Sequence, residues 1–110
     1  MAVKETSDDN LIFELIEHER VILKYHTDTC GKICEELKVI FNDLSNDFAY
    51  TGIAFLRINA DDNPIAKKHV EERKQPIMNI YHKGMLVECR TVATKERIEE
   101  LLETLLKHKC

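Results

Sequence analysis

The sequence of 110 residues has no tryptophan, three glycines and two prolines, and it contains no apolar run long enough to span a membrane. Aromatic residues make up 6% of the chain and basic residues form no stripe, which argues against nucleic acid as a partner. The first ten residues lack the apolar core of a signal peptide. We therefore expect a cytosolic protein that binds neither membrane nor nucleic acid.

The size of the chain predicts one domain over residues 1–110. Hydrophobic residues make up 44% of the sequence, which is enough for a single core, while the length is too short for two domains. The formal net charge of −4 is spread through segments of mixed sign. We expect a monomer, with a dimer as the alternative.

Cysteine is too scarce and too unevenly placed for a secreted disulfide framework, since the chain has four. Cys30 and Cys34 lie close together, Cys89 falls in an expected strand, and Cys110 is the last residue. In a reducing compartment, a close pair indicates either a redox-active dithiol or a metal site. Both interpretations stay open here, and no catalytic role is expected for Cys89 or Cys110.

Apolar periodicity and turn residues predict the order βαβαβαββα. The expected elements are a short strand around Val3, a helix at 9–19, a strand at 21–25, a helix from 31 to 48, a strand at 53–58, a helix at 65–73, strands at 77–81 and 85–92, and a closing helix capped by Thr94. This order predicts an α/β protein with a central mixed sheet covered by helices on both faces.

Three of these helices have apolar residues at helical spacing and are expected to bury them, the closing helix through Ile98, Leu101, Leu102, Leu105 and Leu106. The first is expected to bury Leu11, Ile12, Leu15 and Ile16, and the second Ile33, Leu37, Ile40, Phe41, Leu44 and Phe48. The histidines at positions 18, 69, 82 and 108 lie among charged residues without metal-ligand spacing, so we expect them on the surface.

The junction between the strand at 21–25 and the long helix carries the candidate chemistry. A helix N-terminus has unpaired N–H groups and a partial positive charge, which favour the thiolate form of a cysteine held there. We therefore expect Cys30 to be the attacking thiolate. Cys34 lies beside the apolar stripe of the helix, so it is either the resolving thiol or a small core residue.

Four segments of the chain resemble the thioredoxin family, over nearly its whole length. They are Val21–Tyr25 leading to Thr29-Cys30-Gly31, Val39–Phe48, Arg57–Pro64 and Gln75–Gly84. The resemblance implies a thioredoxin fold and a thiol–disulfide oxidoreductase, a protein disulfide reductase that needs no cofactor. Its partners would be protein disulfides and a reductase that regenerates the dithiol.

The resemblance also implies which residues contact a substrate. Pro76 is expected to be the family's cis-proline beside the dithiol, and the backbone before it, at Gln75, is expected to pair with an extended substrate. Proline is the residue for which a cis bond costs little, so this assignment is physically reasonable. Thr29, Gly31 and Lys32 would complete the substrate-binding surface around the cysteines.

The motif departs from the family's Trp-Cys-Gly-Pro-Cys pattern, because Thr29 replaces the tryptophan and Lys32 the proline. One extra residue makes the motif C-x-x-x-C, and we place it between the two cysteines. Helical Cα atoms four residues apart are about 6 Å from each other, which still permits a disulfide. We predict a local distortion near Lys32 and Ile33, as a wide turn or a π-bulge.

Lys24 occupies the position where the family commonly has a buried acid that accepts a proton from the second cysteine. It either stays charged, reaches solvent and favours a nearby thiolate, or loses solvent, has a lowered pKa and serves as a base. His26 is the other candidate to move this proton.

Two alternatives to an oxidoreductase stay open. The chain would be a redox-inactive binding module if it kept the thioredoxin scaffold without efficient exchange. It would be a metal-binding or iron–sulfur protein if Cys30 and Cys34 held a soft metal, although no third ligand at metal-site spacing is evident and no metal is expected.

Overall fold

The computed structural model describes residues 3–28, 31–73 and 76–109, and its centre is a five-stranded sheet with the strand order β1-β3-β2-β4-β5. The pairs β1–β3 and β2–β3 are parallel, while β2–β4 and β4–β5 are antiparallel, so the sheet is mixed as predicted. The strands are β1 (Val3–Thr6), β2 (Arg20–His26), β3 (Ala54–Asn59), β4 (Ile77–His82) and β5 (Met85–Thr91).

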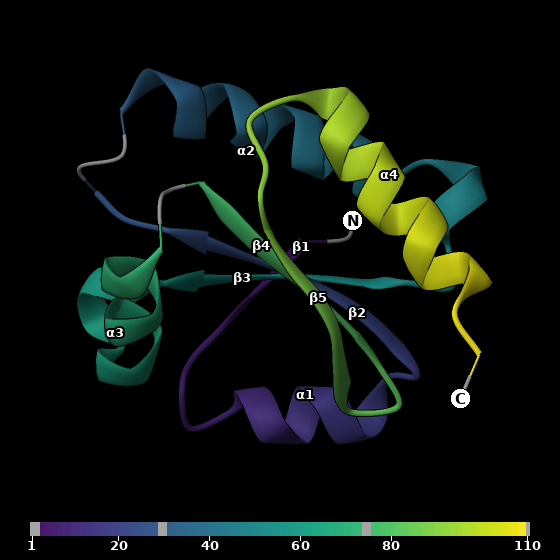
Figure 1. Ribbon diagram of the computed structural model, residues 1–110, viewed down its shortest axis with the longest axis horizontal. Helices are drawn as coiled ribbons and strands as arrows, with labels where there is room; N and C mark the ends of the chain where they lie inside the picture. The colour runs from purple at the N-terminus through teal and green to yellow at the C-terminus, as the bar shows by residue number, and fades with distance from the viewer. Residues whose placement is uncertain (1–2, 29–30, 74–75, 110) are drawn as a thin grey trace.

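Helices cover both faces of this sheet. In Figure 1, α2 and α4 lie on one side of the strands, and α1 and α3 lie on the other. The helices are α1 (Leu11–Glu17), α2 (Lys32–Ser45), α3 (Pro64–Glu72) and α4 (Lys95–Lys107), with short 3₁₀ turns η1 (Phe48–Tyr50) and η2 (Ala60–Asp62). The predicted order βαβαβαββα is therefore confirmed.

The alternation of side chains along the strands divides the core into two layers. On β2, Ile22 belongs to the cluster beneath α2 and α4, whereas Val21 and Leu23 belong to the cluster beneath α1 and α3. Phe41 of α2 packs edge-on against Phe55 of β3, with ring centroids 5.1 Å apart. Because α2 covers only one face of the sheet, this alternation decides which strand side chains point toward α2.

The first helix is shorter and less buried than its pattern predicted. Leu11 and Leu15 are half-buried against the second cluster, but Ile12 and Ile16 are exposed. The prediction of burial is therefore wrong for two of the four residues. Glu14 is buried instead, and its Oε2 accepts a charged contact from Lys4 Nζ at 2.8 Å. The helix is only two turns long, from residue 11 to residue 17. Over this length the two leucines at i and i+4, Leu11 and Leu15, face the sheet.

The long helix is confirmed, with corrections at its ends. Leu37, Phe41 and Leu44 are buried, but Ile33 is half exposed in the first turn. Phe48 lies beyond the helix in η1, and its side chain is 91% exposed. The apolar stripe therefore packs on the sheet from Leu37 to Leu44, which lies in the last turn of α2.

The remaining elements agree closely with the sequence. Thr94 Oγ1 accepts a hydrogen bond from the Arg97 amide at 3.3 Å, as expected for the N-cap of the closing helix. Lys83 and Gly84, both at positive φ, form the turn of the β4–β5 hairpin. Among the helices of the described residues, none is long and apolar enough to cross a membrane.

One histidine is in a different environment from the one expected. The His82 side chain is 3% exposed, with its Nδ1 2.9 Å from His108 Nδ1 and its Nε2 3.2 Å from Glu19 Oε2. The prediction of a surface residue is wrong here because His108, just after α4, packs its ring against that of His82, with ring centroids 5.1 Å apart.

Candidate functional site

Cys34 lies in the first turn of α2, where the chain enters the helix after β2, and it is disulfide-bonded. It is half-buried. Cys89, on β5, is a free cysteine. The predictions for Thr29, Cys30 and Gln75 fall outside the described residues.

The backbone before α2 departs from regular structure at Gly31. Its φ of 86° and ψ of −152° lie in a region that is essentially restricted to glycine. The helix is regular from Lys32, and the Glu35 amide donates to the Gly31 carbonyl at 3.2 Å. The predicted distortion at Lys32 and Ile33 is therefore wrong. The irregularity lies one residue earlier, because glycine adopts this conformation without the cost that interrupting the helix would carry.

A cleft of about 320 Å³ opens beside Cys34. Its lining includes Gly31, Lys24 and His26, so the structure brings together four of the residues predicted for the site. Lys32 and Pro76 do not line this cleft. Lys32 is exposed at the start of α2. Pro76 is buried just before β4, and its carbonyl accepts a hydrogen bond from the Val92 amide at 2.8 Å.

Lys24 is a buried charge on the face of β2 beneath α2. Lys24 is 4% exposed, and its Nζ lies 5.6 Å from the centroid of the Phe41 ring, within cation–π range. Burial, followed by repulsion from Arg57 and Lys38, lowers the pKa of Lys24 to about 8, and Glu5 acts in the opposite direction. Of the two expectations for this lysine, the structure supports the desolvated side chain with a lowered pKa.

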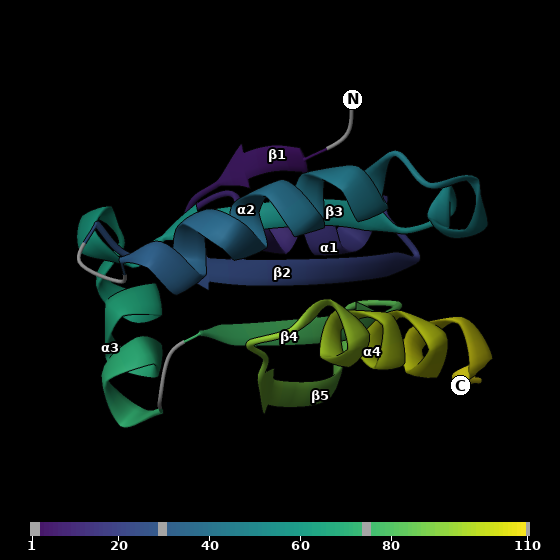
Figure 2. The same ribbon diagram turned by 90° about the horizontal axis from the view of Figure 1, so that it is seen from above.

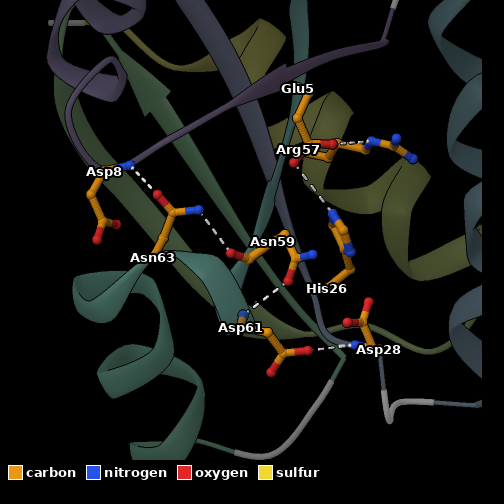
Figure 3. A network of polar contacts seen from close by, with 8 residues as sticks. All are labelled: Glu5, Asp8, His26, Asp28, Arg57, Asn59, Asp61 and Asn63. Carbon is orange, nitrogen blue, oxygen red and sulfur yellow. Dashed lines mark hydrogen bonds and ion pairs between the residues drawn. The ribbon is translucent and has the colours of Figure 1, made fainter.

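His26 lies at the end of the same strand and faces Glu5. The distance from His26 Nε2 to Glu5 Oε2 is 3.5 Å, and the other carboxylate oxygen of Glu5 accepts from Arg57 Nε at 2.6 Å (Figure 3). Burial lowers the pKa of His26 and outweighs the attraction of Glu5. The imidazole is therefore held mostly neutral near pH 7, the form that can accept a proton.

A chain of hydrogen bonds supports the loop that follows β2 (Figure 3). The Asp28 amide donates to Asp61 Oδ2 at 2.8 Å, and the Asp61 amide donates to Asn59 Oδ1 at 2.9 Å. Asn63 Nδ2 donates to the Asn59 carbonyl at 2.8 Å. The start of the segment that leads to the cysteines is thus fixed to the end of β3.

The same network continues to α3. The Asp8 amide donates to Asn63 Oδ1 at 2.8 Å, and the Asp8 carboxylate accepts from the amides of Ile65 and Ala66 at 2.8 and 3.1 Å. These amides belong to the first turn of α3, so Asp8 caps that helix from a distant part of the sequence. The loop between β1 and α1 and the beginning of α3 are thereby held together.

Sequence reasoning missed Arg57, Lys38 and Glu5, which line the hollow around Lys24. The strand register places Glu5 opposite Arg57 and Arg57 opposite Lys24. The sequence did contain a signal for Arg57, because this residue interrupts an otherwise apolar strand, as Lys24 does in its own strand. Their proximity depends on the register between strands that are distant in sequence.

Within the described residues, one group of three side chains has ligand atoms close enough to share a metal ion. It consists of Glu14, Glu17 and His18, at α1 and its C-terminal end. Cys34 lies instead at the start of α2, on the opposite face of the sheet, and its sulfur is engaged in a disulfide. The described part of the chain therefore offers no support for a metal site at Cys34.

Comparison with known proteins finds one family over nearly the whole chain. The family model for thioredoxin matches residues 2–107. The thioredoxins of Gallus gallus and Homo sapiens are each 27% identical to the chain over 86 residues, which cover 78% of this chain and 79% of theirs.

Solved structures show the same fold at lower identity. The thioredoxin of Malassezia sympodialis superposes with a TM-score of 0.82 at 16% identity, covering 96% of this chain and 94% of that one. The oxidised thioredoxin of Plasmodium falciparum gives a TM-score of 0.80 at 20% identity, covering 94% of this chain and 97% of that one. The predicted thioredoxin fold is confirmed.

Proposed function

The chain belongs to the thioredoxin family, and from that premise we propose that it exchanges disulfides with protein substrates through Cys30 and Cys34. Family and fold support a thiol–disulfide oxidoreductase at the general level. The observation that carries the finer proposal is the disulfide at Cys34, in the first turn of the helix that follows β2.

The proposed reaction has two displacement steps. The Cys30 thiolate attacks one sulfur of a substrate disulfide, which forms a mixed disulfide and releases the other substrate sulfur as a thiolate. Cys34 then loses its proton and attacks the Cys30 sulfur, which releases the second substrate thiolate. The substrate gains two electrons, the protein is left with a Cys30–Cys34 disulfide, and an external reductase restores the dithiol.

Sequence distance and topology support Cys30 as the disulfide partner of Cys34. Cys89 is free, and Cys30 precedes Cys34 by four positions. The other remaining cysteine follows α4, whose C-terminal end lies at the opposite end of the molecule from the start of α2 in both views (Figures 1 and 2). Of the possible partners, Cys30 is separated from Cys34 by the fewest residues.

We assign Lys24 as the first candidate to accept the proton of Cys34. Its side chain lines the same cleft as Cys34, and its pKa of about 8 gives a useful fraction of neutral amine near neutral pH. His26 lines this cleft as well, with a lowered pKa, and is the second candidate. If Lys24 is the base, the resolving step accelerates as pH rises through about 8.

Substrate contacts are proposed around the cysteines. Thr29, Gly31 and Lys32 would flank the attacked disulfide, and Gln75 and Pro76 would pair with an extended substrate segment. Pro76 is held in place by the hydrogen bond from Val92, which supports a fixed backbone at this edge. The cytosolic location stays a prediction.

The direct test is reduction of a model protein disulfide with a recycling dithiol present. Cys30→Ser should abolish turnover. Cys34→Ser should also stop turnover but accumulate a mixed disulfide detectable by mass spectrometry, because the first step is intact. Cys89→Ser is the matched control, and it should retain the wild-type rate. A wild-type protein without turnover would contradict the proposal and favour a redox-inactive binding module.

A further inference from the structure

A second hollow lies between α2 and the strands β1, β2 and β3. Its volume is about 680 Å³, and Lys24, Lys38 and Arg57 line both this groove and the cleft at Cys34. We propose that the groove binds an oxyanion, a carboxylate or phosphate group of a small free molecule, through these three cationic side chains. The proposal concerns binding, and it holds whether or not the chain exchanges disulfides.

The strand register concentrates positive charge in the groove. Lys24 is paired with Arg57 on β3, and Arg57 is paired with Glu5 on β1. Like charges at directly paired positions destabilise a sheet. Among the described residues that line the groove, Glu5 is the one carboxylate, and its Oε1 is already engaged by Arg57 Nε at 2.6 Å. Three cations therefore face one anion.

Lys24 is the buried member of this cluster. It is 4% exposed, and its Nζ makes no hydrogen bond or ion pair within the described part of the chain, where its contact is the Phe41 ring. Burying a charge without a counter-ion is costly, and proteins usually avoid it. An oxyanion in the groove would supply the missing negative charge.

The other two cations leave donors for such a ligand. Arg57 uses Nε for Glu5, and its guanidinium carries further N–H donors in a planar fork that suits carboxylate or phosphate. Lys38 is exposed on α2 and forms no ion pair with a residue that the structure describes. One buried and two more accessible cations around a single hollow fit the capture of a small anion from solvent.

Binding and protonation of Lys24 are linked. The charged groups that act on it are Arg57 from β3, Lys38 from α2 and Glu5 from β1, and the first two help burial to lower its pKa to about 8. His26 of β2 and Glu35 of α2 also line the cleft beside it. A bound oxyanion favours the protonated amine, so it raises this pKa, and its own affinity falls as pH rises above about 8. If the oxyanion bound the protein with protonated Lys24 ten times more tightly than the protein with neutral Lys24, the pKa of Lys24 would move to about 9.

The test is an NMR titration of the lysine Cε signals in sulfate and in chloride at equal ionic strength, with Lys24→Met to assign the Lys24 signal. Sulfate keeps its charge throughout the titration range. We expect saturable sulfate binding to one site, with the pKa of Lys24 rising from about 8 to about 9. Equal effects of sulfate and chloride would mean general screening and would overturn the proposal.

A pair of charge-matched variants locates the site. Lys38→Gln should weaken sulfate binding about tenfold, since it removes one of three cations. Lys68→Gln, at an exposed position of α3, should leave binding unchanged. Equal affinities of the two variants would contradict the assignment. An additional acetate titration identifies the ligand class, because acetate binding at the same residues indicates a carboxylate, and sulfate binding alone indicates a phosphate-like dianion.

Discussion

The ammonium group of Lys24 lies over the ring of Phe41, 5.6 Å from its centroid, in the layer between the sheet and α2. The ring offers a negative face, and Phe41 is itself fully buried. This contact offsets part of the cost of burying the amine, but it is weaker than a carboxylate at ion-pair distance. Lys24 is therefore retained at an energetic cost beside the cysteine site, which is where perturbed groups tend to be functional.

Replacing Lys24 by methionine should stabilise the protein at pH 7. Methionine is apolar and similar in shape, so the variant removes the cost of a buried charge. The lowered pKa of about 8 sets that cost at up to about 3 kcal/mol. We expect the free energy of unfolding, measured in urea at low salt, to rise by about 1–3 kcal/mol.

The pH dependence of Lys24→Met provides the control for this prediction. Between about pH 8 and 10.5 the unfolded wild-type chain binds more protons at Lys24 than the folded protein does. Wild-type stability relative to the variant therefore rises with pH through this interval. The prediction would be contradicted by a variant that is less stable than wild type at pH 7 and whose stability does not approach that of wild type at high pH. That result would show that other groups compensate the buried charge of Lys24.

Replacing Gly31 by alanine should destabilise the protein and disturb the site. At φ 86° and ψ −152° a Cβ is strained, although no atom lies within 4 Å of its position. The expected loss is about 1–3 kcal/mol in the free energy of unfolding. Gly52→Ala is the matched control, because its Cβ also meets no atom within 4 Å and its φ is not positive. Equal effects of the two changes would contradict a conformational role for Gly31.

Removing the Asp61 carboxylate should loosen the loop after β2. The Asp28 amide donates to this carboxylate at 2.8 Å, so Asp61→Ala should raise the hydrogen-exchange rate of that amide about tenfold. Asp62→Ala is the control, since the Asp62 side chain has no hydrogen bond with any described residue. Unchanged exchange in Asp61→Ala would mean that other contacts hold the loop.

The strands, the helix order and the Thr94 cap follow from local patterns, so they were predictable from sequence. Val21–Tyr25 is apolar except for Lys24, and Thr94 precedes an amphipathic helix. Strand alternation and N-cap chemistry act over a few residues and need no knowledge of distant partners. The resemblance of the four motif segments to the thioredoxin family predicted the thioredoxin topology, and the structure confirms it.

The surroundings of Lys24 were not predictable in the same way. The pairing of Lys24 with Arg57 joins strands that are separated by α2, and the register between them is a tertiary property. The burial of Glu14 and His82 likewise depends on partners elsewhere, Lys4 and Glu19. The backbone conformation of Gly31 shows how the longer cysteine motif enters a regular helix, which the spacing of the cysteines alone did not specify.

The central claim is a reversible dithiol formed by Cys30 and Cys34. The most direct measurement is a redox titration in dithiol/disulfide buffers, with peptide mapping by mass spectrometry at each potential. We predict one two-electron transition in which Cys30 and Cys34 bridge within the same chain, while Cys89 stays reduced. A bridge from Cys34 to Cys110, a bridge between chains, or the absence of any reversible bridge would contradict the account.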